Sequence, residues 1–130
     1  MNSAEFKTAR EAVGLSVSQV AKIANVGERT VRYWESGRNK PPADVSKKII
    51  EIDNQLEEGV KNTILFVKEM KEKHGKIDEI NLLRYTNDDE LWEKHAEFKG
   101  MPVTVHAAYL GRVKRELEKQ NVVVNLAYSN

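Results

Sequence analysis

Three histidines and the acidic side chains are the residues of this sequence that could carry catalysis or bind a metal ion. The histidines stand at positions 74, 95 and 106, and none of them belongs to the His-Glu-x-x-His spacing of zinc enzymes. His95 is expected on a helix face and His106 in a partly buried place. No glycine-rich phosphate loop follows a predicted strand, and the absence of cysteine excludes a disulfide framework, a Cys-ligated zinc site and a thiol nucleophile. We therefore expect a protein that is not an enzyme, with no catalytic residues, no metal site and no cofactor.

The charge of the chain is divided unevenly along its length. Over 130 residues, 21 basic and 20 acidic side chains leave a net charge of +1, which by itself argues against binding to phosphate. Residues 1–50, however, hold nine basic and five acidic side chains, a net charge of +4, while residues 51–130 have a net charge of −3. This asymmetry is typical of a basic DNA-facing module followed by a module with another task, and random surface variation is the alternative.

Two short helices are expected at the start of the chain. Apolar residues spaced three and four apart predict a first helix over about residues 4–13, with Ser3 as its cap and Gly14 after its end. A capping box at Ser16-Val17-Ser18-Gln19 then predicts a second helix over about residues 17–24.

A third helix is expected to follow a sharp turn. Asn25 tolerates positive φ where a chain must reverse, the third helix begins near Glu28, and Gly37 can end it before a loop at Pro41-Pro42. Its apolar face consists of Thr30, Val31 and Trp34. Two short helices joined by such a turn, the second beginning with exposed polar residues, have the geometry that places one helix in a major groove.

The rest of the chain predicts a long helix and a small α+β region. Apolar residues recur every three or four positions over residues 43–73, with Gly59 as a point of interruption. This seam could pack against a second subunit or within the chain. The further predicted elements are a strand over 77–85, a helix capped within 86–89 that continues to 98, a helix from the cap Thr104 to Asn121, and a strand over 122–128. Two strands alone make a weak sheet, so they either pair within the domain or join a sheet formed by two subunits.

The run from Val20 to Gly37 resembles the Cro and C1-type (XRE-like) helix-turn-helix family of phage repressors. The resemblance covers about residues 4–53, and Gly27 departs from it, because the family often has a capping Ser or Thr there; glycine is an acceptable cap. The matching positions are the small Ala21, Asn25 in place of the turn glycine, the aliphatic Val31 and the ending Trp34-Glu35-Ser36-Gly37.

The resemblance implies a set of side chains that meet base edges: Glu28, Arg29, Arg32 and Tyr33. Arg29 is the strongest candidate, because an arginine can donate to O6 and N7 of guanine, an interaction worth roughly 1–3 kcal/mol of discrimination. Glu28 could accept from cytosine N4, orient Arg29, or simply occupy a helix start where negative charge is favoured. Tyr33 could bond to a phosphate, contact a base, or pack against the next helix.

The same resemblance implies phosphate contacts on either side of the third helix. The residues concerned are Ser16, Val17, Ser18, Arg38 and Lys40. For Arg38 and Lys40, ordinary solvated loop charge is the alternative. Repressors of this type also pair an arginine of the first helix with the glutamate after the aromatic residue, which here implies a structural pair between Arg10 and Glu35.

The second half of the chain resembles the YdiL-like group of small bacterial and phage proteins, which includes regulators of anti-CRISPR operons. The resemblance depends on the chain length, the Trp-Glu-x-Gly context and the order strand-helix-helix-strand, and it implies a C-terminal dimerisation domain.

Together these patterns predict a mainly α fold with a small β component. We expect a lambda-repressor-like helical DNA-binding domain at 1–54 and, at 55–130, the continuation of the long helix with an α+β dimerisation domain. The expected function is that of a cytoplasmic, homodimeric transcriptional regulator of repressor type that binds double-stranded DNA at an inverted repeat. The alternative is an antitoxin-type protein whose C-terminal domain binds a partner protein while the N-terminal DNA-binding domain, the head, controls its own operon. No membrane span or signal peptide is expected in this sequence.

Overall fold

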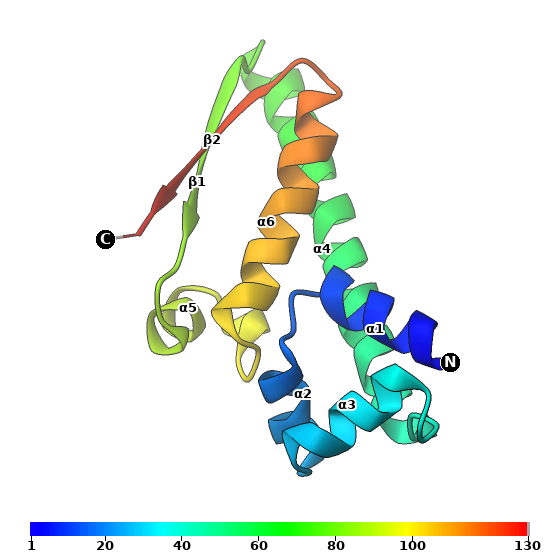
Figure 1. Ribbon diagram of the computed structural model, residues 1–130. Helices are drawn as coiled ribbons and strands as arrows, with labels where there is room; N and C mark the ends of the chain where they lie inside the picture. Colours follow the sequence, from blue (N-terminus) through cyan, green and yellow to red (C-terminus); the bar gives the residue numbers. More distant parts are fainter. Residues whose placement is uncertain (130) are drawn as a thin grey trace. The chain divides into compact units, whose positions relative to one another are not determined.

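The computed structural model describes residues 1–129, and it confirms the expected fold class, mainly α with a small β component (Figure 1). The chain divides into two compact units, unit 1 at Met1–Leu56 and unit 2 from Glu57 onward. Their elements in chain order are α1 (Ser3–Ala12), α2 (Val17–Ala24), α3 (Glu28–Ser36), α4 (Ala43–His74), β1 (Glu79–Arg84), α5 (Asp88–Lys94), the 3-10 helix η1 (Ala96–Phe98), α6 (Val103–Glu118) and β2 (Val123–Tyr128). None of the helices in the described residues is long and apolar enough to cross a membrane.

Unit 1 is built on α1, α2, α3 and the first part of α4. The cap of α1 is Asn2 and not Ser3, which was the residue expected from the sequence. Asn2 is extended and exchanges two hydrogen bonds of 2.8 Å with Glu5, so Ser3 is already the first helical residue. Phe6 and Trp34 are buried and meet edge to face with their ring centroids 5.9 Å apart, which joins α1 to α3.

Unit 2 contains a two-stranded parallel sheet. The strands pair within one chain, from Glu79 beside Val123 to Arg84 beside Tyr128, which settles the pairing that the sequence left open. The parallel direction follows from the connection, because α5 and α6 carry the chain back to the end of the sheet at which β1 began. The core beneath the sheet contains Val60 and Val67 of α4, Val113 and Leu117 of α6, and Val122 and Val124 at the start of β2.

The long helix α4 is not interrupted at Gly59. A Cβ at this position would lie 3.2 Å from Cε1 of Tyr109. The glycine therefore allows α6 to approach α4 closely inside unit 2, and it does not break the helix. Tyr109 also forms a hydrogen bond with Thr63, one turn further along α4.

Two helix boundaries in unit 2 differ from the expected ones. Helix α5 ends at Lys94, and residues 96–98 form a separate 3-10 turn. Helix α6 begins at Val103, one residue before Thr104, which was expected to cap it. Asp88 of α5 explains the difference, because its Oδ1 accepts a hydrogen bond of 2.9 Å from the N–H of Val103 and so satisfies the helix start from another element.

His106 is buried, with 3% of its surface exposed, and this corrects the partly buried place expected for it. Its ring stacks on His95, at a centroid distance of 5.3 Å, and meets the edge of Phe98 at 4.9 Å. Burial, reinforced by repulsion from His95, lowers the pKa of His106 from 6.5 to about 4. His95 follows α5 directly, and its Nε2 lies 3.1 Å from the hydroxyl of Tyr85.

Candidate nucleic-acid interface

Three residues, Asn25–Gly27, separate α2 from α3. Asn25 has φ 55° and ψ 48°, the left-handed conformation expected for it, and the N–H of Val26 donates to the carbonyl of Ala21 over 3.0 Å. Gly27 is extended at φ −75° and begins α3 without a side-chain cap. The tight turn fixes the direction in which α3 leaves α2. Helix α3 ends at Ser36, and Gly37 after it has φ 88°.

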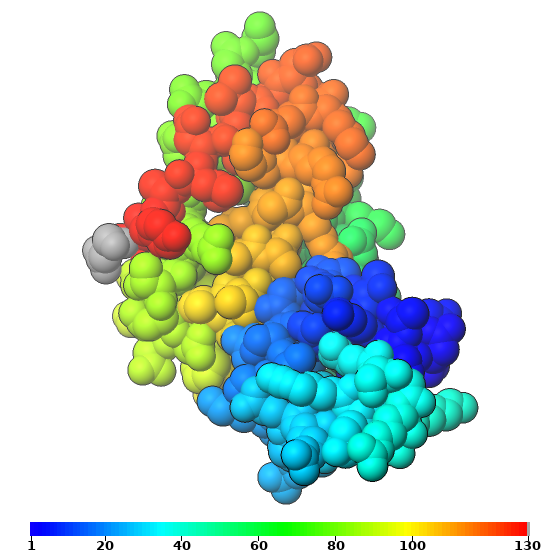
Figure 2. Space-filling view, in the orientation of Figure 1, coloured from blue at the N-terminus to red at the C-terminus, as the bar shows by residue number. Residues whose placement is uncertain are grey.

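Helix α3 has one buried face and one exposed face. Val31 and Trp34 are 0% and 5% exposed and anchor the helix in the core of unit 1, while Thr30 is half-buried. On the opposite side Glu28, Arg29 and Arg32 are exposed, and Tyr33 is half-buried. The segment that holds α3 and the loop after it is cyan in Figure 2, where it forms part of the visible surface of unit 1. The predicted base-contacting residues therefore lie on one short helix whose other face is packed in the core of unit 1.

The exposed face of α3 contains one internal ion pair. Glu28 Oε1 lies 3.7 Å from Nη2 of Arg32, one turn further along, and both side chains are more than half exposed. The partner of Glu28 is thus Arg32 and not Arg29, which was the partner considered from the sequence. An exposed pair at this spacing contributes only about 0.3–0.5 kcal/mol, so either side chain can leave it for another contact.

Tyr33 and Arg38 form a contact that sequence reasoning missed. The guanidinium carbon of Arg38 lies 4.2 Å from the ring centroid of Tyr33, a cation–π arrangement across the end of α3. The five-residue spacing crosses Gly37, so no helical periodicity could reveal it. Arg38 is exposed and lies beside α3, and Lys40 is exposed in the same loop.

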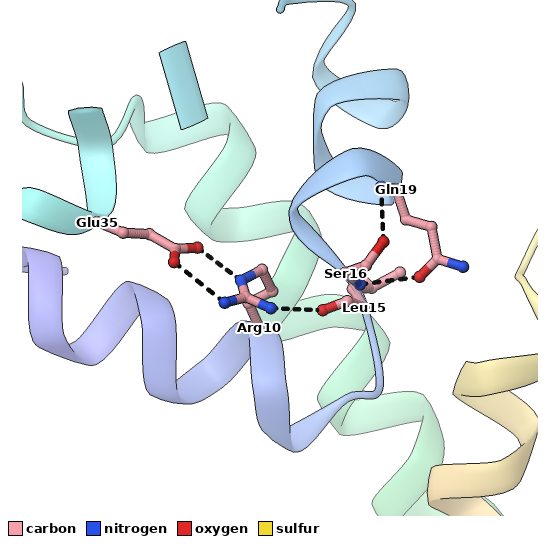
Figure 3. Close-up of polar contacts among 5 residues, drawn as sticks. All are labelled: Arg10, Leu15, Ser16, Gln19 and Glu35. Carbon is pink, nitrogen blue, oxygen red and sulfur yellow. Dashed lines mark hydrogen bonds and ion pairs between the residues drawn. The ribbon is translucent and has the colours of Figure 1, made fainter. Parts of the chain in front are cut away.

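The start of α2 provides a second set of donors. Ser16 Oγ accepts from the N–H of Gln19 over 3.1 Å, and the Ser16 N–H donates to Oε1 of Gln19 over 2.9 Å, as Figure 3 shows. This capping box leaves the N–H groups of Val17 and Ser18 without a helical acceptor, as at every helix start. Ser16 and Ser18 are exposed and Val17 is half-buried, so an anion can approach these donors.

Arg10 and Glu35 lie behind this surface and are joined by two hydrogen bonds. Arg10 Nε donates to Glu35 Oε2 over 2.6 Å, and Nη2 donates to Oε1 over 3.1 Å (Figure 3). A third bond of 2.9 Å joins Nη1 to the carbonyl of Leu15. Their side chains are only 11% and 10% exposed, so the pair connects α1, the end of α3 and the approach to α2 and makes no part of the exposed face.

Comparison with known proteins shows the family of the chain and one similar phage protein. The chain belongs to the family described as a domain of unknown function (DUF4447), whose model matches residues 1–126. It is also similar to the Aca2 repressor of Pectobacterium phage ZF40, with 30% identity over 84 residues that cover 55% of this chain and 72% of the relative. This similarity is to a protein named as a repressor and points to a regulator.

Proposed function

We propose that this protein is a sequence-specific DNA-binding repressor that reads DNA through its helix-turn-helix, with α3 in the major groove. The observation that carries the proposal is the division of α3 into two faces. Its polar side chains are exposed, while Val31 and Trp34 bury the other face in the core of unit 1. The name of the phage relative agrees with this reading. The proposed action requires neither catalysis nor a cofactor.

Each exposed residue has a proposed role. Arg29 donates to the O6 and N7 atoms of guanine, and Arg32 and Glu28 exchange their mutual ion pair for base contacts. Tyr33 contacts DNA at the edge of the same helix, with Arg38 stacked on its ring. The proposed phosphate contacts come from the start of α2 and from the loop after α3, at Ser16, Val17, Ser18, Arg38 and Lys40.

We also propose that the protein binds an inverted repeat as a homodimer formed through unit 2. A two-fold dimer would place two heads about one helical turn of DNA apart. Large apolar side chains remain exposed in unit 2, which supports an interface there. They are Leu65 and Phe66 on α4, Leu83 on β1, and Val123, Leu126 and Tyr128 on β2.

A second candidate function is that of an antitoxin-type protein whose unit 2 holds another protein. Leu65 and Phe66 favour it, because these neighbouring residues of α4 are 55% and 61% exposed. A homodimer that leaves this pair uncovered would keep an apolar surface for a partner. Protection of the Phe66 side chain from chemical labelling in the purified dimer distinguishes the two functions, because a homodimer that covers this pair leaves no such surface for a partner.

Selection of bound sequences from random duplexes tests the proposed function. The wild-type protein should enrich a palindromic sequence at moderate salt. Arg29→Ala should relax the preference at one position of each half-site, at a cost of roughly 1–3 kcal/mol, because a base contact is lost. Lys40→Ala should weaken all duplexes alike and reduce the salt dependence, because a phosphate contact is lost.

Two results would contradict the proposal. Failure of the wild-type protein to enrich any palindrome would remove the DNA-reading function. Equal losses from Arg29→Ala and Lys40→Ala on all duplexes would show that Arg29 does not read a base.

A further inference from the structure

The outer edge of β2 has main-chain groups with no third strand beside them. The N–H of Val123 donates to the carbonyl of Asp78 and that of Ser129 to the carbonyl of Arg84, each over 2.9 Å. In a parallel ladder the main-chain N–H and C=O groups of every second residue are directed to the same neighbouring strand. Those of residues 123, 125, 127 and 129 therefore face β1. The N–H and C=O groups of residues 124, 126 and 128 therefore point to the opposite edge, and the sheet in the described residues ends there.

This edge lacks the features that keep exposed strands apart. The sequence of β2 is Val-Val-Asn-Leu-Ala-Tyr, with no charged residue, no proline and no glycine. Strand edges of monomeric proteins usually have charges, prolines, bulges or very short strands, because unpaired backbone groups otherwise bind another strand. Strand β1, in contrast, has Glu79 and Arg84 at its two ends. The β2 edge is thus the unprotected edge of this sheet.

The side chains of β2 are covered at one end of the strand only. Val124, Leu126 and Tyr128 share one face, because side chains alternate along a strand. Val124 is 5% exposed and belongs to the core of unit 2, whereas Leu126 is 44% and Tyr128 65% exposed. The face that α4 and α6 cover at Val124 is therefore uncovered at the end of β2.

We propose that a second copy of this chain pairs with the β2 edge in antiparallel direction about a two-fold axis at Leu126. This inference rests on the homodimer in the proposed function and names its interface. Leu126 would lie opposite Leu126 of the partner subunit, and Val124 opposite Tyr128 of the partner subunit. Residues 124, 126 and 128, whose main-chain N–H and C=O groups face the outer edge, then all form hydrogen-bonded pairs with the partner strand. The two sheets become one sheet of four strands.

The structure favours this register over its neighbour centred on Asn125. Asn125 already donates from its amide to Glu79 and to Asn81 of β1, so its side chain serves the existing sheet. The Leu126 register instead forms a row of Val124, Leu126 and Tyr128 side chains from both copies. The row is uncharged, so the two-fold axis brings no like charges together, and it covers the two exposed side chains.

A matched pair of proline variants tests the edge. Leu126→Pro removes an N–H that points away from β1, and Leu83→Pro removes one that points away from β2, on the opposite edge. Light scattering of the full chain at fixed concentration should give the molecular mass of a dimer of 14.8 kDa chains for the wild type and for Leu83→Pro. For Leu126→Pro the dimer dissociation constant should rise about tenfold or more, because two symmetric hydrogen bonds are lost.

A cysteine variant tests the register without disturbing the backbone, since the natural chain has no cysteine. Leu126→Cys should give a covalent dimer on oxidation or with a short thiol cross-linker, because opposed residues lie about 5.5 Å apart between Cα atoms. Val123→Cys, which is more exposed at 58%, should cross-link much more slowly.

The outcomes separate the inference from the proposed function. A monomeric wild-type protein would overturn the homodimer itself. A dimeric wild type with an equally stable Leu126→Pro dimer and equal cross-linking at 123 and 126 would overturn the β2 interface and leave the homodimer in place.

Discussion

The buried ring of His106 should make unit 2 sensitive to pH. The folded protein lowers the pKa of this imidazole from 6.5 to about 4, mainly because burial disfavours its charged form. The Nδ1 atom lies within the protein without a hydrogen-bond partner among the described residues, so it has no acceptor ready for a second proton. Protonation of His106 should therefore favour unfolding of unit 2.

The direction and the size of the effect follow from proton linkage. Between pH 6.5 and 4 the unfolded chain binds a proton at this residue that the folded chain does not bind, so stability falls as the pH is lowered through this range. The full difference in pKa corresponds to about 3 kcal/mol of unfolding free energy. Between pH 7.5 and pH 5 the expected loss is about 2 kcal/mol.

Trp92 offers a reporter for unit 2 alone. The chain has two tryptophans, and Trp34→Phe removes the one in unit 1. Urea unfolding followed by Trp92 fluorescence at pH 7.5 and 5, at constant protein concentration, gives the free energy of unfolding in each condition. His106→Leu in the same background keeps a buried apolar side chain but removes the titrating group.

The difference between the two proteins isolates His106 from the carboxylates that titrate in the same range. Between the two pH values, the free energy of unfolding should fall by about 2 kcal/mol more in the protein with His106 than in His106→Leu. His74→Leu, which changes an exposed histidine, should behave like the parent protein. An equal loss in the parent protein and in His106→Leu would refute the reasoning.

Two further predictions concern unit 1, and both can be measured by urea unfolding with Trp34 as the reporter in a Trp92→Phe background. Glu35→Gln should lower the free energy of unfolding by about 3 kcal/mol, because it leaves the buried Arg10 guanidinium without a charged partner. Asn25→Val should cost about 1–2 kcal/mol, because a β-branched residue does not suit φ 55°, whereas Asn25→Gly should change little. A smaller cost for Asn25→Val than for Asn25→Gly would contradict the second prediction.

Features that depend on neighbouring residues could be predicted from the sequence. The capping box at Ser16 and Gln19 acts over three residues, and the left-handed turn at Asn25 depends on one side chain, so both were visible locally. The order of helices and strands in unit 2 followed in the same way from local patterns. The parallel pairing of the two strands did not, since it depends on the end of the sheet to which α5 and α6 return the chain.

Other features depend on distant residues, and apart from the Arg10–Glu35 pair, which the family resemblance implied, they could not be predicted. Asp88 caps α6 from fifteen residues away, and no local pattern around Thr104 indicates that Asp88 takes the place of Thr104 as the cap. The burial of His106 depends on His95, Phe98 and Tyr85 gathering around it from different segments. Within the candidate site, the stacking of Arg38 on Tyr33 depends on how the chain leaves Gly37, and the pairing of Glu28 with Arg32 was one of several geometries that the spacing allowed.

The division of charge connects the two parts of the proposed function. Residues 1–50 have a net charge of only +4, so under the proposed function one head would have a weak general attraction to DNA, and the net charge of −3 in the remainder would oppose non-specific adhesion. Two heads held together bind the second half-site at a high effective concentration and so gain affinity without new contacts. An uncharged pairing edge at β2 suits this arrangement, because it adds no positive charge that would bind DNA of any sequence. Under this proposal, selectivity comes from α3, and useful affinity comes from the dimer.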